Sequence, residues 1–132
     1  MNQCMTIRPA VEADAPLIVR LIRALAEYEH LLDRVKVTEE GIVRYLFREH
    51  IAEALIAECG GEAAGFALFF QTFSTFVGKP GIYIEDLFVL PVFRGLGLGK
   101  MLMKEVAAIA VKRDCGRLEW SCLDWNEPSI RF

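Results

Sequence analysis

A short glycine-rich segment, RGLGLGK at residues 94–100, joins a strand-like run to a helix-like run. Successive small residues let backbone N–H groups turn inward toward an anion, and the first turn of the following helix adds positive potential. Arg94 and Lys100 place a cationic side chain at each end of the segment. The segment therefore predicts a phosphate-binding loop. A tight turn in which glycine only permits positive φ is the competing interpretation.

Neither of two common phosphate-binding patterns fits this segment. The dinucleotide pattern G-x-G-x-x-G, read from Gly95, fails because Lys100 stands where the third glycine should be. The P-loop pattern G-x-x-x-x-G-K-[ST] fails because Arg94 replaces its first glycine and Met101 replaces the hydroxyl residue that binds Mg²⁺. The sequence therefore disfavours a dinucleotide-binding protein and a nucleoside triphosphatase.

Two adjacent carboxylates, Glu85 and Asp86, lie in the strand-like run before the glycine segment. Successive side chains of a strand point to opposite faces, so both can reach one substrate atom only if a β-bulge intervenes. A structural role for one of the two carboxylates is the alternative.

Helical periodicity predicts two early helices that would pack against these strands. Asp14 is expected to cap the first helix, with Pro16 in its first turn. The apolar stripe of this helix contains Leu17, Leu21, Leu25 and Tyr28. Thr38 is expected to cap the second helix. The expected core face of the second helix contains Ile42, Tyr45 and Leu46.

From Ala54 the pattern changes to that of strands. Residues 54–59 and 63–73 flank Gly60-Gly61, which predicts a hairpin whose turn needs positive φ twice. A further strand ends at Pro91, a helix follows the glycine segment, and another strand runs through Leu118, Trp120 and Cys122. Asn126 is expected to cap a last helix, with Pro128 in its first turn. The order β-α-α-β-β-β-α-β-(α) predicts a single α/β (α+β) domain over residues 1–132, with an antiparallel meander and one parallel crossover.

Composition narrows the class of protein. Hydrophobic residues make up 54% and charged residues 25%, which is typical of a globular domain. The net charge of −3 disfavours nucleic-acid binding. No apolar run approaches the length of a membrane span, and no secretory leader pattern opens the chain. The four cysteines form no C-x-x-C pair and the two histidines have no ligand spacing, so we expect free thiols in the cytoplasm and no metal site.

The motif R-x-x-G-x-G after an E-D-L-F-V strand resembles the acetyl-CoA loop of the GNAT N-acetyltransferase superfamily. Ordered matches over essentially the whole chain (IRPA…AD, LAEYE, YIEDLFVLPVFRGLGLG and WNEPSIRF) look like the diamine (spermidine/spermine) and thialysine acetyltransferase branch. The resemblance implies the GNAT acyl-CoA N-acyltransferase fold, a mixed and mostly antiparallel sheet with flanking helices and a splayed parallel strand pair. It also implies an enzyme that transfers the acetyl group of acetyl-CoA to a primary amine of a small, polyamine-like substrate, by direct attack in a ternary complex.

The resemblance also implies roles for individual residues. Glu85 is expected to remove the amine proton directly or through water, with Asp86 as a supporting or substrate-binding carboxylate. The residues expected to bind acetyl-CoA are Leu87, Phe88, Val89, Arg94, Gly95, Leu96, Gly97, Leu98, Gly99, Lys100, Asn126 and Ser129. The residues expected to bind the amine are Tyr28, Glu29, Phe76, Glu85 and Glu119, with Phe73 beside Phe76 at the rim. Trp120 also matches a substrate-side position. Core packing of Tyr28 and Trp120 and solvent exposure of Glu29 are the alternatives.

The last residues depart from the family pattern. In the family, a tyrosine that protonates the leaving thiolate follows the N-E-P-S segment, whereas this sequence stops at Phe132, one position before it. The two C-terminal strands of the fold are also missing, so we expect a truncated chain. The branch pairs its protomers, which predicts a homodimer. The main alternative is a non-catalytic acyl-CoA-binding or sensor module that retains the loop and lacks the acid.

Overall fold

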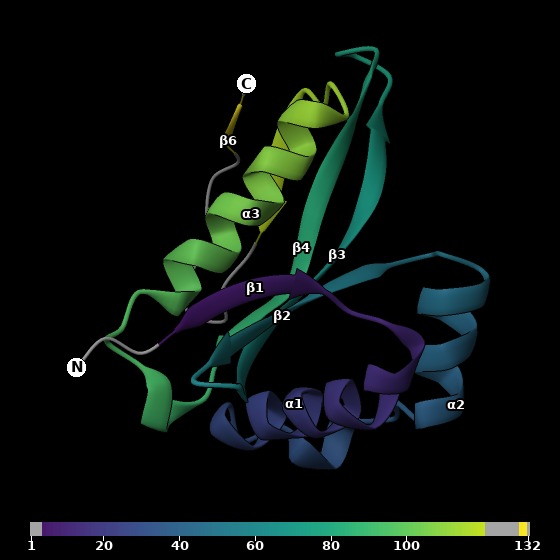
Figure 1. Ribbon diagram of the computed structural model, residues 1–132. Coiled ribbons are helices and arrows are strands. Elements are labelled where there is room, and N and C mark those ends of the chain that lie inside the picture. The colour runs from purple at the N-terminus through teal and green to yellow at the C-terminus, as the bar shows by residue number, and fades with distance from the viewer. Residues whose placement is uncertain (1–3, 121–129, 132) are drawn as a thin grey trace.

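The computed structural model describes residues 4–120 and 130–131, and Figure 1 shows how the elements are arranged. The helices and strands are β1 (Met5–Pro9), α1 (Ala15–Tyr28), α2 (Glu39–Ile42), β2 (Glu53–Cys59), β3 (Glu62–Ser74), β4 (Lys79–Val89), α3 (Leu98–Lys112), β5 (Arg117–Trp120) and β6 (Ile130–Arg131). Short 3-10 helices lie at Glu12–Asp14, Leu32–Arg34 and Pro91–Phe93, and a π-helix spans Val43–Arg48. The predicted element order is confirmed as far as β5.

The strands form one mixed sheet in the order β1-β2-β3-β4-β5-β6. Every neighbouring pair is antiparallel except β4 and β5, which are parallel and are joined through α3. The turn between β2 and β3 has φ of +60° at Gly60 and +84° at Gly61, which confirms the predicted hairpin turn. The long β3–β4 hairpin rises beyond the rest of the sheet, and its tip lies beside the end of α3 in Figure 1.

The sheet separates two hydrophobic cores. On one face, Leu55 of β2 and Ile84 of β4 pack with Leu102 and Val106 of α3. On the other face, Ile56 of β2 packs with residues of α1 and α2, among them Ile18 and Ile42. Because alternate residues of a strand point to opposite faces, β2 contributes to both cores along its whole length. The two cores fix α3 on one side of β4 and α1 on the other.

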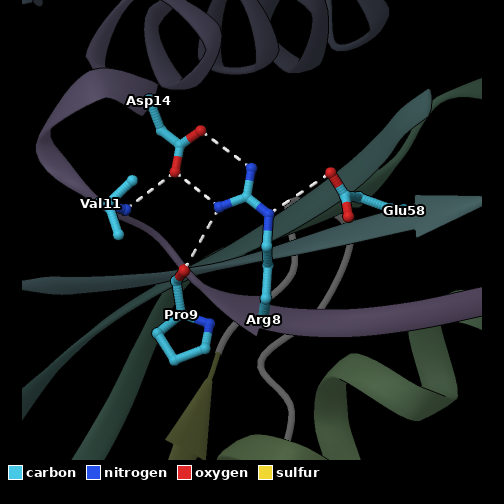
Figure 2. A network of polar contacts seen from close by, with 5 residues as sticks. All are labelled: Arg8, Pro9, Val11, Asp14 and Glu58. Carbon is cyan, nitrogen blue, oxygen red and sulfur yellow. Dashed lines mark hydrogen bonds and ion pairs between the residues drawn. The ribbon is translucent and has the colours of Figure 1, made fainter. Parts of the chain in front are cut away.

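An ion-pair network ties the start of α1 to the sheet (Figure 2). The Asp14 carboxylate accepts hydrogen bonds from both terminal guanidinium nitrogens of Arg8, at 2.7 and 2.9 Å, and from the backbone N–H of Val11 at 2.8 Å. Arg8 Nε also lies 3.4 Å from the Glu58 carboxylate of β2. Asp14 precedes α1, and Pro16 occupies the first turn, but the expectation that the Asp14 side chain caps this helix is wrong. The buried carboxylate is instead held by Arg8, which lowers its pKa.

The second helix agrees with its predicted start and departs from its predicted core face. Thr38 Oγ1 accepts a hydrogen bond from the backbone N–H of Gly41 at 3.0 Å, which confirms the cap. Ile42 and Leu46 are buried, but Tyr45 is 42% exposed, so its assignment to the core was wrong. The physical reason is the change from α2 to a π-helix at Val43, since the wider turn of the backbone no longer follows the α-helical spacing.

The end of the chain also differs from its expected helix. Ile130 and Arg131 form β6, which pairs antiparallel with β5 in the register Leu118↔Ile130. An open strand edge offers unpaired backbone donors and acceptors, so even a short segment can add to it. Asn126, the expected cap of the last helix, and Pro128, expected in its first turn, lie outside the described residues.

Candidate active site

In the described part of the chain, the last residues of β4 lie beyond the parallel pair with β5. Among the described residues, β4 pairs with β5 only from Gly81↔Arg117 to Ile84↔Trp120, although β4 itself continues to Val89. On its other side, β4 stays paired with β3 as far as Gly65↔Val89. A strand that loses one neighbour offers backbone N–H and C=O groups to another partner. Within the described residues, the segment 85–89 can therefore offer backbone groups to a ligand.

A β-bulge at Glu85 sets which way the side chains of this segment point. The ladder pairs Phe69 with Ile84 and then Leu68 with Asp86, so Glu85 is the extra residue. The predicted condition of a bulge between the two carboxylates is thus met. Beyond the bulge, Leu87 packs against the core on the α3 side, and Phe88 lies in the core on the α1 side.

Three carboxylates interact on the α1 side of β4. Burial raises the pKa of Asp86 to about 6, and the negative charges of Glu85 and Glu29 add to the shift. Glu29 immediately follows α1, and Glu85 is exposed at the bulge. A group of like charges that repel one another favours a bound cation. The arrangement therefore suits a cationic ligand that approaches between α1 and β4.

The glycine segment lies against the end of β4 and lines a cavity of about 390 Å³. Gly95 and Gly97 have φ of +82° and +89°, and Gly97 is the residue before α3. Glycine is thus required there by backbone conformation, as the turn interpretation holds. Gly99 has no such requirement, and a β-carbon on it would only touch Val89 Cγ2 at 3.8 Å. The cavity is lined by Leu87, Phe88, Val89, Phe93, Arg94, Gly95, Gly97, Leu98 and Gly99.

This lining contains most of the residues that we expected to bind acetyl-CoA. Leu96 lies on the same loop and Lys100 in the first turn of α3; both are exposed, and neither is part of the lining. Asn126 and Ser129 lie outside the described residues. Phe93 also lines the cavity and was not predicted from the sequence. Its position as a large apolar residue directly before the R-x-x-G-x-G motif could have indicated it.

Arg94 points toward α1. Its Nε donates a hydrogen bond to the Val89 carbonyl at 3.0 Å. Its guanidinium carbon lies 4.3 Å from the ring centre of Tyr28 and 5.4 Å from that of Phe88. Tyr28 is 56% exposed, so it is not a core residue. The structure thus brings Tyr28 and the glycine loop together through a cation–π contact.

Other residues expected at the acceptor pocket lie elsewhere. Phe76 is fully exposed in the turn between β3 and β4 and lines a separate cavity with Gly116 and Arg117. Phe73 lies opposite Pro80, six residues before Asp86 along β4, which is about 20 Å of extended strand. Within one chain, the structure does not bring these two aromatic residues together with Asp86.

The two substrate-side candidates of β5 have different surroundings. Glu119 lies opposite Tyr83 of β4, and its carboxylate is 3.8 Å from Arg117 Nε. Trp120 packs against the core on the α3 side, as its alternative interpretation predicted.

Within residues 4–120 and 130–131, no cluster of His, Cys, Asp or Glu side chains could hold a metal ion. None of the helices in this part of the chain is long and apolar enough to cross a membrane.

Comparison with known proteins identifies the family. Residues 19–132 match the acetyltransferase (GNAT) family. The chain is 41% identical over 133 residues to a thialysine N-epsilon-acetyltransferase of Bos taurus, covering 94% of this chain and 78% of that protein. It is 32% identical over 134 residues to spermidine/spermine N(1)-acetyltransferase-like protein 1 of Homo sapiens, covering 96% of this chain and 19% of that protein.

A solved structure supports the same fold. A ribosomal-protein-alanine N-acetyltransferase of Brucella melitensis superposes with a TM-score of 0.73 at 24% identity, covering 98% of this chain and 100% of that chain. The predicted fold class and enzyme class are confirmed, and the two sequence relatives agree with the predicted branch. The chain belongs to the acetyltransferase (GNAT) family.

Proposed function

We propose that this chain transfers the acetyl group of acetyl-CoA to a primary amine of a small aminoalkyl or polyamine-like substrate, by direct attack in a ternary complex. One observation carries the proposal. The last residues of β4 have carboxylates on the α1 side, and the glycine-lined cavity lies at the end of the strand. A cationic acceptor and an anionic donor can therefore meet at the same strand.

The glycine loop fits the phosphates of acetyl-CoA. Gly97, the residue before α3, has a left-handed conformation, and Gly99 leaves its part of the cavity without a side chain. Backbone N–H groups at such a helix start bind anions, and the helix dipole adds to the attraction. Bound acetyl-CoA supplies the activated thioester. We keep the exposed Leu96 and Lys100 and the residues Asn126 and Ser129 as proposed donor contacts.

The acceptor side fits a protonated amine. Glu29, Glu85 and Asp86 repel one another, and an ammonium group relieves that repulsion. The amine, with a pKa of about 10.4, must lose a proton before it attacks. A base with a pKa of about 6 is well matched to that task near neutral pH. We therefore assign removal of the amine proton to Asp86 and binding of the cationic amine to Glu85. This assignment reverses the roles expected from the sequence.

The backbone of residues 87–89 completes the proposed site. A backbone N–H group on the side of β4 away from β3 can donate to the carbonyl oxygen as it gains negative charge, which stabilises the transition state. Tyr28 and Glu119 remain proposed acceptor contacts. Phe76 lies at the other end of β4, so a contact from Phe76 to the acceptor requires a second copy of the chain. This requirement is consistent with the homodimer that we propose, and sedimentation velocity tests it.

The cellular location is also a proposal. Cys4 and Cys115 form no disulfide, which suits a reducing compartment. We accordingly propose that the enzyme works in the cytoplasm, where fractionation of the expressing cell would find it.

A thiol-release assay tests the proposed function. The protein is given acetyl-CoA together with spermidine, thialysine or lysine, and free CoA is measured over time. We expect release with at least one amine and intersecting initial-velocity lines, because both substrates must be bound together. Parallel lines would contradict the ternary complex. Binding of acetyl-CoA by calorimetry without release for any amine would support the sensor module instead.

A further inference from the structure

Arg94 connects the donor loop to the acceptor side through three contacts. Its Nε donates to the Val89 carbonyl at 3.0 Å, and its guanidinium carbon lies 4.3 Å from the Tyr28 ring centre and 5.4 Å from that of Phe88. The Tyr28 and Phe88 rings are themselves 5.9 Å apart. The guanidinium therefore packs against both aromatic residues while its backbone belongs to the glycine loop.

These contacts bridge the two halves of the proposed site. Arg94 and Val89 line the donor cavity. Tyr28 is the last residue of α1 and is followed directly by Glu29, whose charge acts on Asp86. A movement of Tyr28 would consequently move Glu29 relative to the carboxylates of β4. The stack thus holds the end of α1 at a fixed place beside the end of β4.

Arg94 also lies at the donor cavity. It lines this cavity together with Gly97 and Leu98. Its expected role as countercharge for the donor phosphates therefore stays a prediction, and the contact with Tyr28 is a second role that does not depend on it.

We propose that Arg94 is a positioning residue for the acceptor amine, and that it acts by holding Tyr28 and thereby Glu29 beside Asp86. The proposal rests on the proposed function, since it takes the three carboxylates as the amine-binding group. A planar guanidinium can stack on a ring and donate from Nε at the same time. A lysine side chain carries the same charge without the plane or the Nε donor, so charge alone would not replace Arg94.

Four single substitutions and one double substitution test the proposal. They are Arg94→Met, Arg94→Lys, Tyr28→Leu, Tyr28→Phe and the pair Arg94→Met with Tyr28→Leu. For each variant we would measure the KM for the amine, the affinity for CoA by calorimetry, and the denaturant midpoint. We expect Arg94→Met, Arg94→Lys and Tyr28→Leu each to raise the amine KM roughly two- to tenfold. Tyr28→Phe keeps the ring and should resemble the wild type.

The coupling between the two residues is the sharper readout. The double variant should raise the amine KM no more than either single variant, because both remove the same contact. CoA affinity should stay within about twofold of the wild type in Tyr28→Leu and Tyr28→Phe, because Tyr28 does not line the donor cavity. Additive effects on the amine KM would overturn the proposal. So would an amine KM that Arg94→Lys leaves at the wild-type value.

Two controls separate this proposal from the proposed function. Arg44 lies 5.1 Å from the Tyr45 ring centre in a similar stack on the π-helix, and Arg44→Met should leave the amine KM and CoA affinity unchanged. Lys100→Met removes the other cation of the loop and should weaken CoA binding. A wild-type protein that releases no thiol with any amine would overturn the proposed function. The contact between Arg94 and Tyr28 would then be tested by denaturant unfolding alone. Additive shifts of the denaturant midpoint for Arg94→Met and Tyr28→Leu would show that the two residues are not coupled.

Discussion

Gly61 and Gly97 share one backbone conformation, with φ of +84° and +89°, and a β-carbon on either would meet no atom within 4 Å. Gly61 lies in the β2–β3 turn, whereas Gly97 begins α3 beside the cavity. The two positions therefore have the same conformational requirement, and only one of them lies at the proposed donor site. This match allows backbone strain to be separated from ligand binding.

Alanine at Gly97 should weaken donor binding more than it weakens the fold. We expect Gly97→Ala and Gly61→Ala to lower the free energy of unfolding by a similar amount, about 1–2 kcal/mol, because both force a β-carbon into the left-handed region. Only Gly97→Ala should also weaken CoA binding, by roughly tenfold as loop N–H groups shift. Denaturant unfolding and calorimetry provide the two measurements. Equal effects of the two variants on both quantities would support a purely structural turn.

Alanine at Gly99 should act on the donor alone. Its β-carbon would only touch Val89 Cγ2, at an ordinary contact distance of 3.8 Å, while entering the cavity lining. Stability should therefore stay within about 0.5 kcal/mol of the wild type, and CoA affinity should fall. An unchanged affinity would mean that the donor backbone contact lies elsewhere on the loop.

Asparagine at Asp86 should stabilise the protein above pH 6. The folded pKa of about 6 lies above the ordinary value of 3.8, so the folded state binds the proton more tightly than the unfolded state. Stability from this group is present at low pH and is lost as pH rises from about 4 to 6. Asp86→Asn removes that loss and should be more stable by about 1–2 kcal/mol at pH 7, after allowance for partial exposure. The difference should vanish near pH 4 in denaturant unfolding. A less stable variant at pH 7 would contradict the assigned shift.

The same carboxylate should control the pH profile of the reaction. If Asp86 takes the amine proton, kcat/KM should rise through pH 6 as this group ionises. Glu85→Gln should keep that limb because Glu85 is exposed at the bulge, whereas Asp86→Asn should lose it. If only Glu85→Gln lost the rise of kcat/KM through pH 6, Glu85 rather than Asp86 would be the base.

Asparagine at Asp14 should lower stability at neutral pH and remove part of its acid sensitivity. Arg8 lowers the pKa of Asp14 below its ordinary value of 3.8, so this group stabilises the fold above that value and the stabilisation is lost as pH falls. We expect Asp14→Asn to cost about 1–3 kcal/mol at pH 7 in denaturant unfolding. Glu53 makes a similar two-bonded pair with Arg113 at 2.7 Å on the surface, and Glu53→Gln should cost less than about 1 kcal/mol. Equal losses would show that burial of Asp14 contributes little.

Features with a local cause could be predicted from the sequence. The Gly60-Gly61 turn, the Thr38 cap and the crossover helix depend on residues close together in the chain, and all three are present. The glycine loop is a further local feature. Its motif itself contains the glycines that need positive φ and the glycine that leaves space in the cavity. The bulge at Glu85 could be stated only as a condition, since register depends on the partner strand.

Features with a tertiary cause could not be predicted. The direction of Arg94 depends on Tyr28, which lies far away in the sequence and reaches it only because both cores pack on one sheet. The Asp14 carboxylate faces Arg8 rather than the helix start for the same reason. Tyr45 shows a third case, in which a change of helix type overrides a regular spacing.

The bulge has a consequence for how this strand can vary. The single extra residue at Glu85 exchanges inside and outside for everything that follows it, since Ile84 and Leu87 share a face three positions apart instead of two or four. With regular alternation from Ile84 and the same number of residues, Asp86 would face the core beneath α3 and Leu87 would face α1. The irregular pairing with Phe69 and Leu68 instead keeps Asp86 on the α1 side. The site is thus specified by the register of β4 against β3 as much as by the identity of its residues.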